Sequence, residues 1–199
     1  MIKIVVSGQA SDTGKTTFIE KSIKNLKGRV AAIKCAMGKE NEDFFVRKEK
    51  NKSDDSDTAR YLKAGAVESI LSSSNLDILA DKIDEAENIL EEDPEYLIYE
   101  GNSILKFVRP QLVIYLKMVG RETKPSGEFA EKKADIIINM SKKNNKVTYF
   151  FDDIVFNGEK ISCFKAHLIA EITGNSVGKV GRKISEQGVK IKNCQLGLF

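Results

Sequence analysis

The chain of 199 residues has no tryptophan, only three prolines and only three cysteines. Three cysteines (Cys35, Cys163 and Cys194) are too few for a disulfide framework and are typical of a protein kept in a reducing compartment. No apolar run approaches the roughly 20 residues that a membrane span needs, and the first residues, MIKIVVSGQA, lack the hydrophobic region of a signal peptide. We therefore expect a cytoplasmic protein with no membrane-bound segment.

An excess of one charge is also missing. The 32 Lys and Arg residues face 29 Asp and Glu residues, and the formal net charge is +3. This balance does not by itself indicate a nucleic-acid partner. Hydrophobic residues make up 41% of the chain, which is enough to bury the core of one domain with a small appendage.

Short apolar runs alternate with helical patterns in the larger part of the chain. The runs cover residues 2–7, 29–36, 67–73, 95–101, 111–117 and 134–139, and the helical patterns cover 15–27, 57–64 and 77–91. Most runs are continuous in Val, Ile and Leu rather than alternating, as in strands buried on both faces of a parallel sheet. The sequence thus predicts βαβ units in a three-layer α/β domain over residues 1–150. Residues 38–56 are charged and aperiodic, and they predict a long mobile loop.

The pattern changes after about residue 147. KVTYFFDDIVFNGEKIS predicts a strand pair with its turn at Asn157-Gly158, followed by helices over 161–173 and 176–187 and a final β-like run. Residues 157–199 form a small appendage with seven basic and three acidic side chains, a net charge of 7 − 3 = +4. They predict either a winged helix-turn-helix that binds DNA or a small capping or docking unit. We favour the capping unit because no aromatic residues interleave with the basic ones.

Cys163, His167 and Cys194 raise the question of a metal site. Cys163 and His167 share one helix face, but a zinc site would need a fourth ligand. A buried cysteine and a partly exposed histidine are the favoured interpretation.

The stretch GQASDTGKTT, residues 8–17, links the first strand to the first helix. Backbone N–H groups of such a loop, with the positive end of the helix, can surround a phosphate. Lys15 would reach the β and γ phosphates, and the Thr16 hydroxyl would hold Mg²⁺. Asp12 would point away from the phosphates, because a carboxylate repels them. The predicted nucleotide contacts are Gly8, Ser11, Asp12, Thr13, Gly14, Lys15, Thr16 and Thr17.

Five residues separate Gly8 from Gly14, where the common signature has four. This spacing resembles that of dethiobiotin synthetase and its relatives. The resemblance implies a second reading of the chain, in which a substrate carboxylate or carbamate attacks the γ-phosphate of ATP.

Three further stretches, VAAIKCAMGK (30–39), SDTARYLKAGAVESILSS (56–73) and YLIYEGN (96–102), follow the phosphate loop. In order and spacing they resemble the family of the molybdopterin-guanine dinucleotide biosynthesis adaptor, the B protein of that pathway, over roughly residues 1–117. The family's histidine after the lysine is Cys35 here, and the appendage lies outside its usual pattern. This resemblance implies a P-loop NTPase that binds Mg²⁺ with GTP or ATP, hydrolyses it slowly and assists a cofactor-synthesising protein. It also suggests a homodimer, by analogy only.

Carboxylates are candidates for the metal. Glu100 ends a predicted strand and could reach Mg²⁺ or its bound water, so we assign it a catalytic role beside Lys15. Resemblance to both families implies Asp57 as a second metal contact, with Asp54 and Asp55 as alternatives. Asp57 could equally be the N-cap of the following helix.

Two other polar positions complete the candidate site. Lys34 ends the second strand and could point at a phosphate or an anionic substrate, or into solvent. Asn139 stands where related P-loop proteins place an asparagine against the base, and residues 124–126 could lie beside that pocket. No N/TKxD guanine signature is present, so the sequence leaves GTP and ATP open. A third reading, a nucleotide-gated DNA-binding regulator, would use the basic appendage.

Overall fold

The computed structural model describes residues 1–38, 43–143 and 146–194. The helices are α1 (Lys15–Asn25), α2 (Asp57–Ala64), α3 (Leu79–Asn88), α4 (Pro125–Lys133), α5 (Cys163–Thr173) and α6 (Val177–Glu186), with 3-10 turns η1 (Ser103–Lys106) and η2 (Phe151–Asp153). The strands are β1 (Ile2–Gly8), β2 (Val30–Met37), β3 (Val46–Lys48), β4 (Glu68–Ser74), β5 (Tyr96–Glu100), β6 (Leu112–Met118), β7 (Ile136–Lys143), β8 (Lys146–Thr148), β9 (Ile154–Phe156), β10 (Lys160–Ser162) and β11 (Lys190–Lys192).

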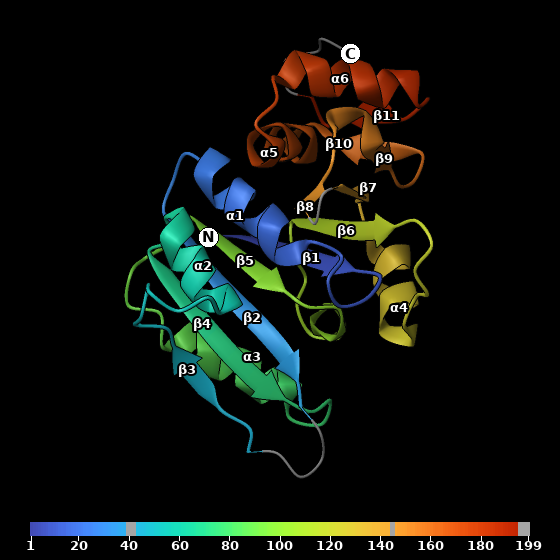
Figure 1. The fold of residues 1–199 in the computed structure, drawn as a ribbon. Helices are drawn as coiled ribbons and strands as arrows, with labels where there is room; N and C mark the ends of the chain where they lie inside the picture. The colour runs from blue at the N-terminus through green and yellow to red at the C-terminus, as the bar shows by residue number, and fades with distance from the viewer. Residues whose placement is uncertain (39–42, 144–145, 195–199) are drawn as a thin grey trace.

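The main sheet has the order β3-β4-β2-β5-β1-β6-β7-β8, with β9 also paired to β7 (Figure 1). The central strands β4, β2, β5, β1, β6 and β7 are parallel. Their carboxyl ends therefore meet at one edge of the sheet, where open α/β folds bind their ligands.

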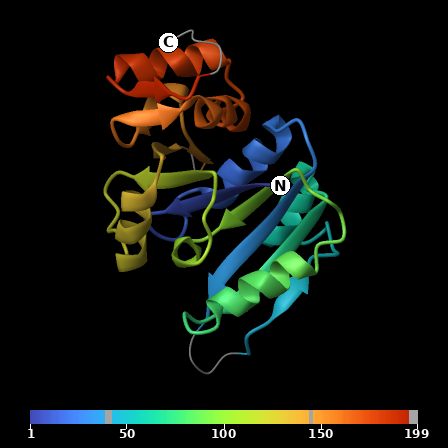
Figure 2. The ribbon, with the colours of Figure 1, turned by 180° about the vertical axis from the view of Figure 1, so that it is seen from behind.

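Helices cover both faces of this sheet. Helices α1, α2 and α5 pack on one face, while α3 and α4 pack on the other, as the view from behind shows (Figure 2). In β1, Ile4 and Val6 point to the α1 face and Val5 points to the α3 face. All three side chains are buried, because helices cover both faces of the sheet. This explains why the central strands carry hydrophobic residues at nearly every position.

The structure confirms the three-layer α/β fold with a mostly parallel sheet that the sequence predicts. The predicted central strands and the first three helices are all present, with boundaries that differ by a few residues. One expectation was incomplete, because part of the charged segment 38–56 is a strand. There β3 pairs antiparallel with β4 at the sheet edge, and residues 39–42 lie outside the described ranges.

The predicted hairpin with its turn at Asn157-Gly158 is wrong. Strand β9 pairs antiparallel with the start of β7, and β10 pairs in parallel with β11. Ile154 and Phe156 of β9 are buried in the core, and the Asn157 side-chain amide donates to the Ala134 carbonyl at 2.9 Å. Burial against β7 therefore determines the path of this segment, which the local Asn-Gly signal does not reveal.

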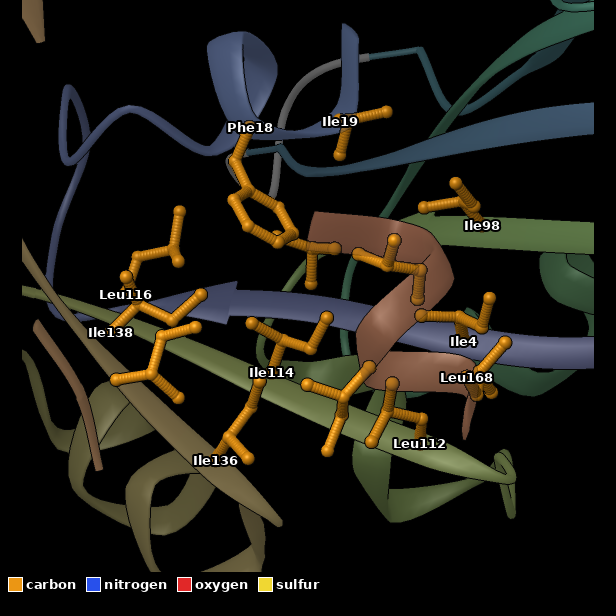
Figure 3. Packing of buried hydrophobic residues seen from close by; sticks show 14 of the residues in the cluster. Ile4, Phe18, Ile19, Ile98, Leu112, Ile114, Leu116, Ile136, Ile138 and Leu168 are labelled. Carbon is orange, nitrogen blue, oxygen red and sulfur yellow. The ribbon is translucent and has the colours of Figure 1, made fainter. Parts of the chain in front are cut away.

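The C-terminal helices lie close to the expected positions, and α5 packs directly against α1. Leu168 of α5 lies beside Ile4 and Leu112 (Figure 3), and the Asn25 side-chain amide donates to the Ile172 carbonyl at 3.0 Å. The two-stranded sheet of this segment is parallel, so a winged-helix form is not confirmed. The division into a domain over 1–150 and an appendage over 157–199 stays a prediction.

The cysteine of this helix is less buried than the favoured interpretation expects. Cys163 is only half-buried, and His167 is exposed on α5. Within the described residues, no group of three His, Cys, Asp or Glu side chains is placed to hold a metal ion. No helix in the described ranges has the length and apolarity to cross a membrane.

Candidate functional site

The loop between β1 and α1 has the backbone form that its glycines permit. Gly14 has a φ of 90°, a left-handed conformation that glycine adopts without strain, and α1 begins at the next residue, Lys15. A Cβ on Gly8 would come 2.6 Å from the Thr13 hydroxyl oxygen. Both glycines are thus required by the local geometry.

The loop leaves donors at the start of α1. Within the described ranges, the backbone N–H groups of Gly14, Lys15 and Thr16 donate to no other group. The Lys15 ammonium crosses the loop and donates to the Ala10 carbonyl at 2.9 Å. This arrangement of free N–H groups and one cation suits an anionic oxygen ligand.

The loop accommodates its extra residue with a second left-handed position, at Asp12, ahead of Gly14. Asp12 has a φ of 57° and is exposed, and the Arg121 guanidinium donates to the neighbouring Ser11 carbonyl at 2.6 Å. The Thr13 hydroxyl donates to the Ala10 carbonyl at 3.1 Å and so points into the loop itself. The longer spacing therefore forms a bulge and leaves the Gly14-Lys15-Thr16 turn in place.

A cavity of about 400 Å³ opens at this turn. Such a volume is within the range of small-molecule sites. Five parts of the chain converge on it: the phosphate loop with the start of α1, the later part of β2, the start of α2, the end of β5, and β8. Its lining residues are Ser11, Asp12, Gly14, Lys15, Thr16, Thr17, Lys34, Asp57, Arg60, Glu100 and Val147.

Two carboxylates and one lysine form an ion-pair cluster in this cavity. The Lys34 ammonium pairs closely with Asp57 and lies 3.9 Å from Glu100 Oε1. The other Glu100 oxygen accepts a short hydrogen bond from the buried Tyr61 hydroxyl. Glu100 is 6% exposed, so these two partners replace much of the hydration that its carboxylate loses on burial.

The family model described as "Molybdopterin guanine dinucleotide synthesis protein B" matches residues 2–105. The chain belongs to this family. The match runs from β1 past the end of β5, so it includes the phosphate loop, Lys34, Asp57 and Glu100. No curated protein and no solved structure matches the chain.

The family resemblance stated from the sequence is thereby confirmed. The name of the family connects the chain with the synthesis of molybdopterin guanine dinucleotide, which is part of molybdenum cofactor biosynthesis. The matched region ends well before β7 and the C-terminal helices.

Sequence reasoning missed several residues that shape the site in this family member. The Asn102 side chain accepts from the Gly8 N–H and donates to the Gly8 carbonyl, both at 2.9 Å. It thereby holds the end of β5 against the beginning of the phosphate loop. Asn102 stood in the quoted YLIYEGN stretch, but nothing local shows that it pairs with a residue 94 positions away.

Arg60 was also missed. Its guanidinium makes two hydrogen bonds to the Glu20 carboxylate, at 3.1 and 2.6 Å, and lies 3.7 Å from Asp57 Oδ1. A further bond of 3.3 Å reaches the Thr17 hydroxyl. Arg60 therefore links α1 to α2 at the rim of the cavity.

A third missed feature covers the loop from the side of β7. A Cβ on Gly14 would lie 2.6 Å from Val147 Cγ1 and 3.1 Å from the Met140 methyl carbon. The apolar side chains of β7 and β8 therefore pack directly on the left-handed residue of the loop.

Burial changes the acid–base properties of the site. Desolvation lowers the pKa of Lys15, although the nearby Glu100 charge acts in the opposite direction. Desolvation and the Glu100 charge both raise the pKa of Tyr61, and they raise the pKa of the Cys35 thiol to about 12. Tyr61 and Cys35 are thus neutral at physiological pH.

Not every predicted residue reaches the cavity. Asp57 lines it, whereas Asp54 and Asp55 do not and instead contact Lys63 on the surface. The N-cap interpretation of Asp57 is wrong, because Ser56 caps α2 with its side-chain oxygen. Asn139 is half-buried within β7, which continues to residue 143, and it does not line the cavity.

Residues 124–126 lie beside the loop itself. The Lys124 N–H donates to the Gln9 carbonyl at 3.2 Å, and the Ser126 hydroxyl accepts a 3.4 Å hydrogen bond from the Asn102 amide. The roles of these residues and of Asn139 toward a base stay predictions.

Proposed function

We propose that this protein binds GTP or ATP together with Mg²⁺ in the cavity at the phosphate loop, hydrolyses it slowly and assists a cofactor-synthesising partner in molybdenum cofactor biosynthesis. One observation carries the proposal: Lys15, two carboxylates and the free N–H groups of α1 converge on a single cavity of suitable size. Membership of the family supports the pathway.

The donors in the cavity fit Mg²⁺. This ion prefers oxygen ligands and usually takes one or two carboxylates together with phosphate oxygens and water. The Thr16 hydroxyl, Asp57 and Glu100 supply oxygen donors of this kind. When bound, Mg²⁺ would neutralise charge on the phosphate oxygens.

The protein's own residues would divide the remaining work. Lys15 and the N–H groups of the loop would bind the β and γ phosphates, and Lys15 would leave the Ala10 carbonyl to do so. Glu100 would accept a hydrogen bond from the attacking water and orient it. Asn102 would keep the loop at a fixed position relative to Glu100.

Slow turnover follows from how the other cations are held. Lys34 is paired with Asp57, and Arg60 is held by Glu20. Of the three basic side chains that line the cavity, Lys15 is thus the one with no carboxylate partner among the described residues. Transition-state charge on the γ-phosphate would gain little further stabilisation until a partner protein moved one of these pairs.

The test is calorimetric titration with GTP and with ATP, each with Mg²⁺ and with a chelator. Lys15→Ala should abolish the Mg²⁺-dependent binding of both nucleotides, while Lys27→Ala, a change at an exposed lysine just after α1, should leave it intact. Unchanged affinity in Lys15→Ala would refute the proposed nucleotide site. The ratio of the two affinities identifies the base.

The dethiobiotin-synthetase-like spacing of the loop favours a second candidate, an ATP-dependent phosphoryl transfer to a carboxylate or carbamate. A large acceleration of ATP hydrolysis by one small carboxylic acid would support it, and hydrolysis indifferent to such acids would support the adaptor. The DNA-binding alternative requires salt-sensitive DNA binding that changes with nucleotide. Sedimentation of the full chain tests the expected homodimer.

A further inference from the structure

A second groove lies away from the nucleotide cavity, between the end of α1, the segment 149–151 and the start of α6. Its volume is about 420 Å³, and it shares no lining residue with the cavity at the phosphate loop. We call it the aromatic–lysine groove. Three lysines (Lys21, Lys24 and Lys179) and three aromatic residues (Tyr149, Phe150 and Phe151) line it.

The lysines of the groove are uncompensated. Lys21, Lys24 and Lys179 are exposed, and within the described ranges none of them pairs with a carboxylate. Two instead lie over rings: Lys21 Nζ is 5.4 Å from the centre of Tyr149, and Lys179 Nζ is 4.4 Å from the centre of Phe151. Three positive charges around one groove attract an anion.

The neighbouring carboxylates are occupied elsewhere. Asp152 lies 3.8 Å from the Lys183 ammonium, and Asp153 accepts a 2.7 Å hydrogen bond from the Phe150 N–H. The acidic residues next in sequence to the aromatic segment therefore contact groups other than the three lysines of the groove.

The aromatic side chains differ in how far they are covered. Tyr149 packs against Phe18 with ring centres 5.5 Å apart, and Phe151 is half-buried below Lys179. Phe150 is 69% exposed. Keeping a large apolar ring in water is unfavourable, and its free face can stack against a planar ring.

Two asparagines add acceptors at the edge of the groove. Asn25 uses its amide N–H on the Ile172 carbonyl and Asn175 uses its own on the Thr173 carbonyl, both at 3.0 Å. No donor in the described residues reaches either side-chain oxygen. The N–H groups of a heterocycle could bond to these oxygens.

We propose that the aromatic–lysine groove binds a phosphorylated heteroaromatic small molecule of mononucleotide size. The ring stacks on Phe150, and the phosphate lies among Lys21, Lys24 and Lys179. A compact ligand fits better than a nucleic acid, because other basic residues of this segment do not extend the groove into a track. Lys165 and Lys183, for example, contact Asp135 and Asp152. The proposal does not depend on the function of the phosphate loop.

The experiment uses the full chain carrying Lys15→Ala, so that binding at the phosphate loop does not contribute. AMP, adenosine and inorganic phosphate are titrated by calorimetry, and ring signals of Tyr149 and Phe150 are followed by NMR. AMP should bind more tightly than either of its parts and should shift those signals. Lys179→Gln and Phe150→Ala should each weaken AMP binding about fivefold or more. Phe150→Tyr, which keeps an aromatic ring, should bind AMP about as tightly as the chain that carries Lys15→Ala alone.

Lys132→Gln, a change at an exposed lysine of α4 on the opposite face of the sheet, is the matched control and should leave AMP binding unchanged. Three results would overturn the proposal: no AMP binding by the Lys15→Ala chain, AMP binding indifferent to the Lys179 and Phe150 variants, or oligothymidylate binding tighter than AMP with a steep salt dependence. The last result would identify a surface for single-stranded nucleic acid instead.

Discussion

Replacing Lys34 by methionine separates the charge of the cavity from its shape. The Lys34 ammonium lies between Asp57 and Glu100, and its side chain is 26% exposed. Methionine has a similar length but no charge, so the two carboxylates would face each other without a cation between them. We expect the variant to fold, to lose stability without metal, and to regain it when Mg²⁺ is added.

The magnitude follows from the geometry. At 3.9 Å and an effective dielectric constant of about 20, the Lys34–Glu100 attraction alone is about 4 kcal/mol. Partial exposure of Lys34 and the desolvation cost that its removal recovers reduce this to about 2 kcal/mol. For a chain of this size, that corresponds to a melting temperature lower by about 4–8 °C.

The assay is thermal unfolding followed by circular dichroism, at low ionic strength, with a chelator and then with excess Mg²⁺. Mg²⁺ should raise the melting temperature of Lys34→Met more than that of the parent, because the ion replaces the missing cation between the carboxylates. Lys63→Met is the matched control: Lys63 is 41% exposed and its partner Asp55 is fully exposed. Equal Mg²⁺ effects on Lys34→Met and the parent would show that the two carboxylates do not form a metal site.

Three further predictions concern the same cavity. Asn102→Ala removes both hydrogen bonds to Gly8 and should cost about 1–3 kcal/mol in urea unfolding, with weaker nucleotide binding; equal binding would mean that Asn102 does not position the loop. Tyr61→Phe removes the donor to the buried Glu100 carboxylate and should cost about 1–3 kcal/mol of stability, so an unchanged urea midpoint would contradict that bond. Because burial lowers the pKa of Lys15, nucleotide affinity should fall as pH rises through a value below 10.5, while Lys15→Arg, which stays charged, should lack this step in calorimetry.

The parts of the fold and site that could be predicted from the sequence are those determined by local chemistry. Continuous Val and Ile runs identify the central strands, and the glycines and lysine of the loop identify a phosphate cradle. Glu100 and Lys34 could be placed near that loop because the carboxyl ends of parallel strands share one edge of the sheet. The structure brings both residues into the cavity, together with Asp57.

The parts that could not be predicted depend on contacts between distant segments. Tyr61 donates to Glu100 across 39 positions of sequence, and Asn102 bonds to Gly8 across 94. Neither pairing leaves a trace in spacing or periodicity. The Asn-Gly turn failed for the same reason, since the burial of β9 against β7 outweighs a two-residue preference.

Strand β7 pairs with segments on its C-terminal side, and this has a practical consequence for truncating the protein. Strand β8 pairs with its far end, β9 pairs with its near end, and α5 packs against α1 beneath the same sheet. Cutting the chain after residue 156 would strip α5 from the core and expose apolar side chains such as Leu168 to water. A truncated chain that aggregated would thus say nothing about what residues 157–199 bind. Surface charge changes on α6, which keep the core covered, are the informative way to probe that segment.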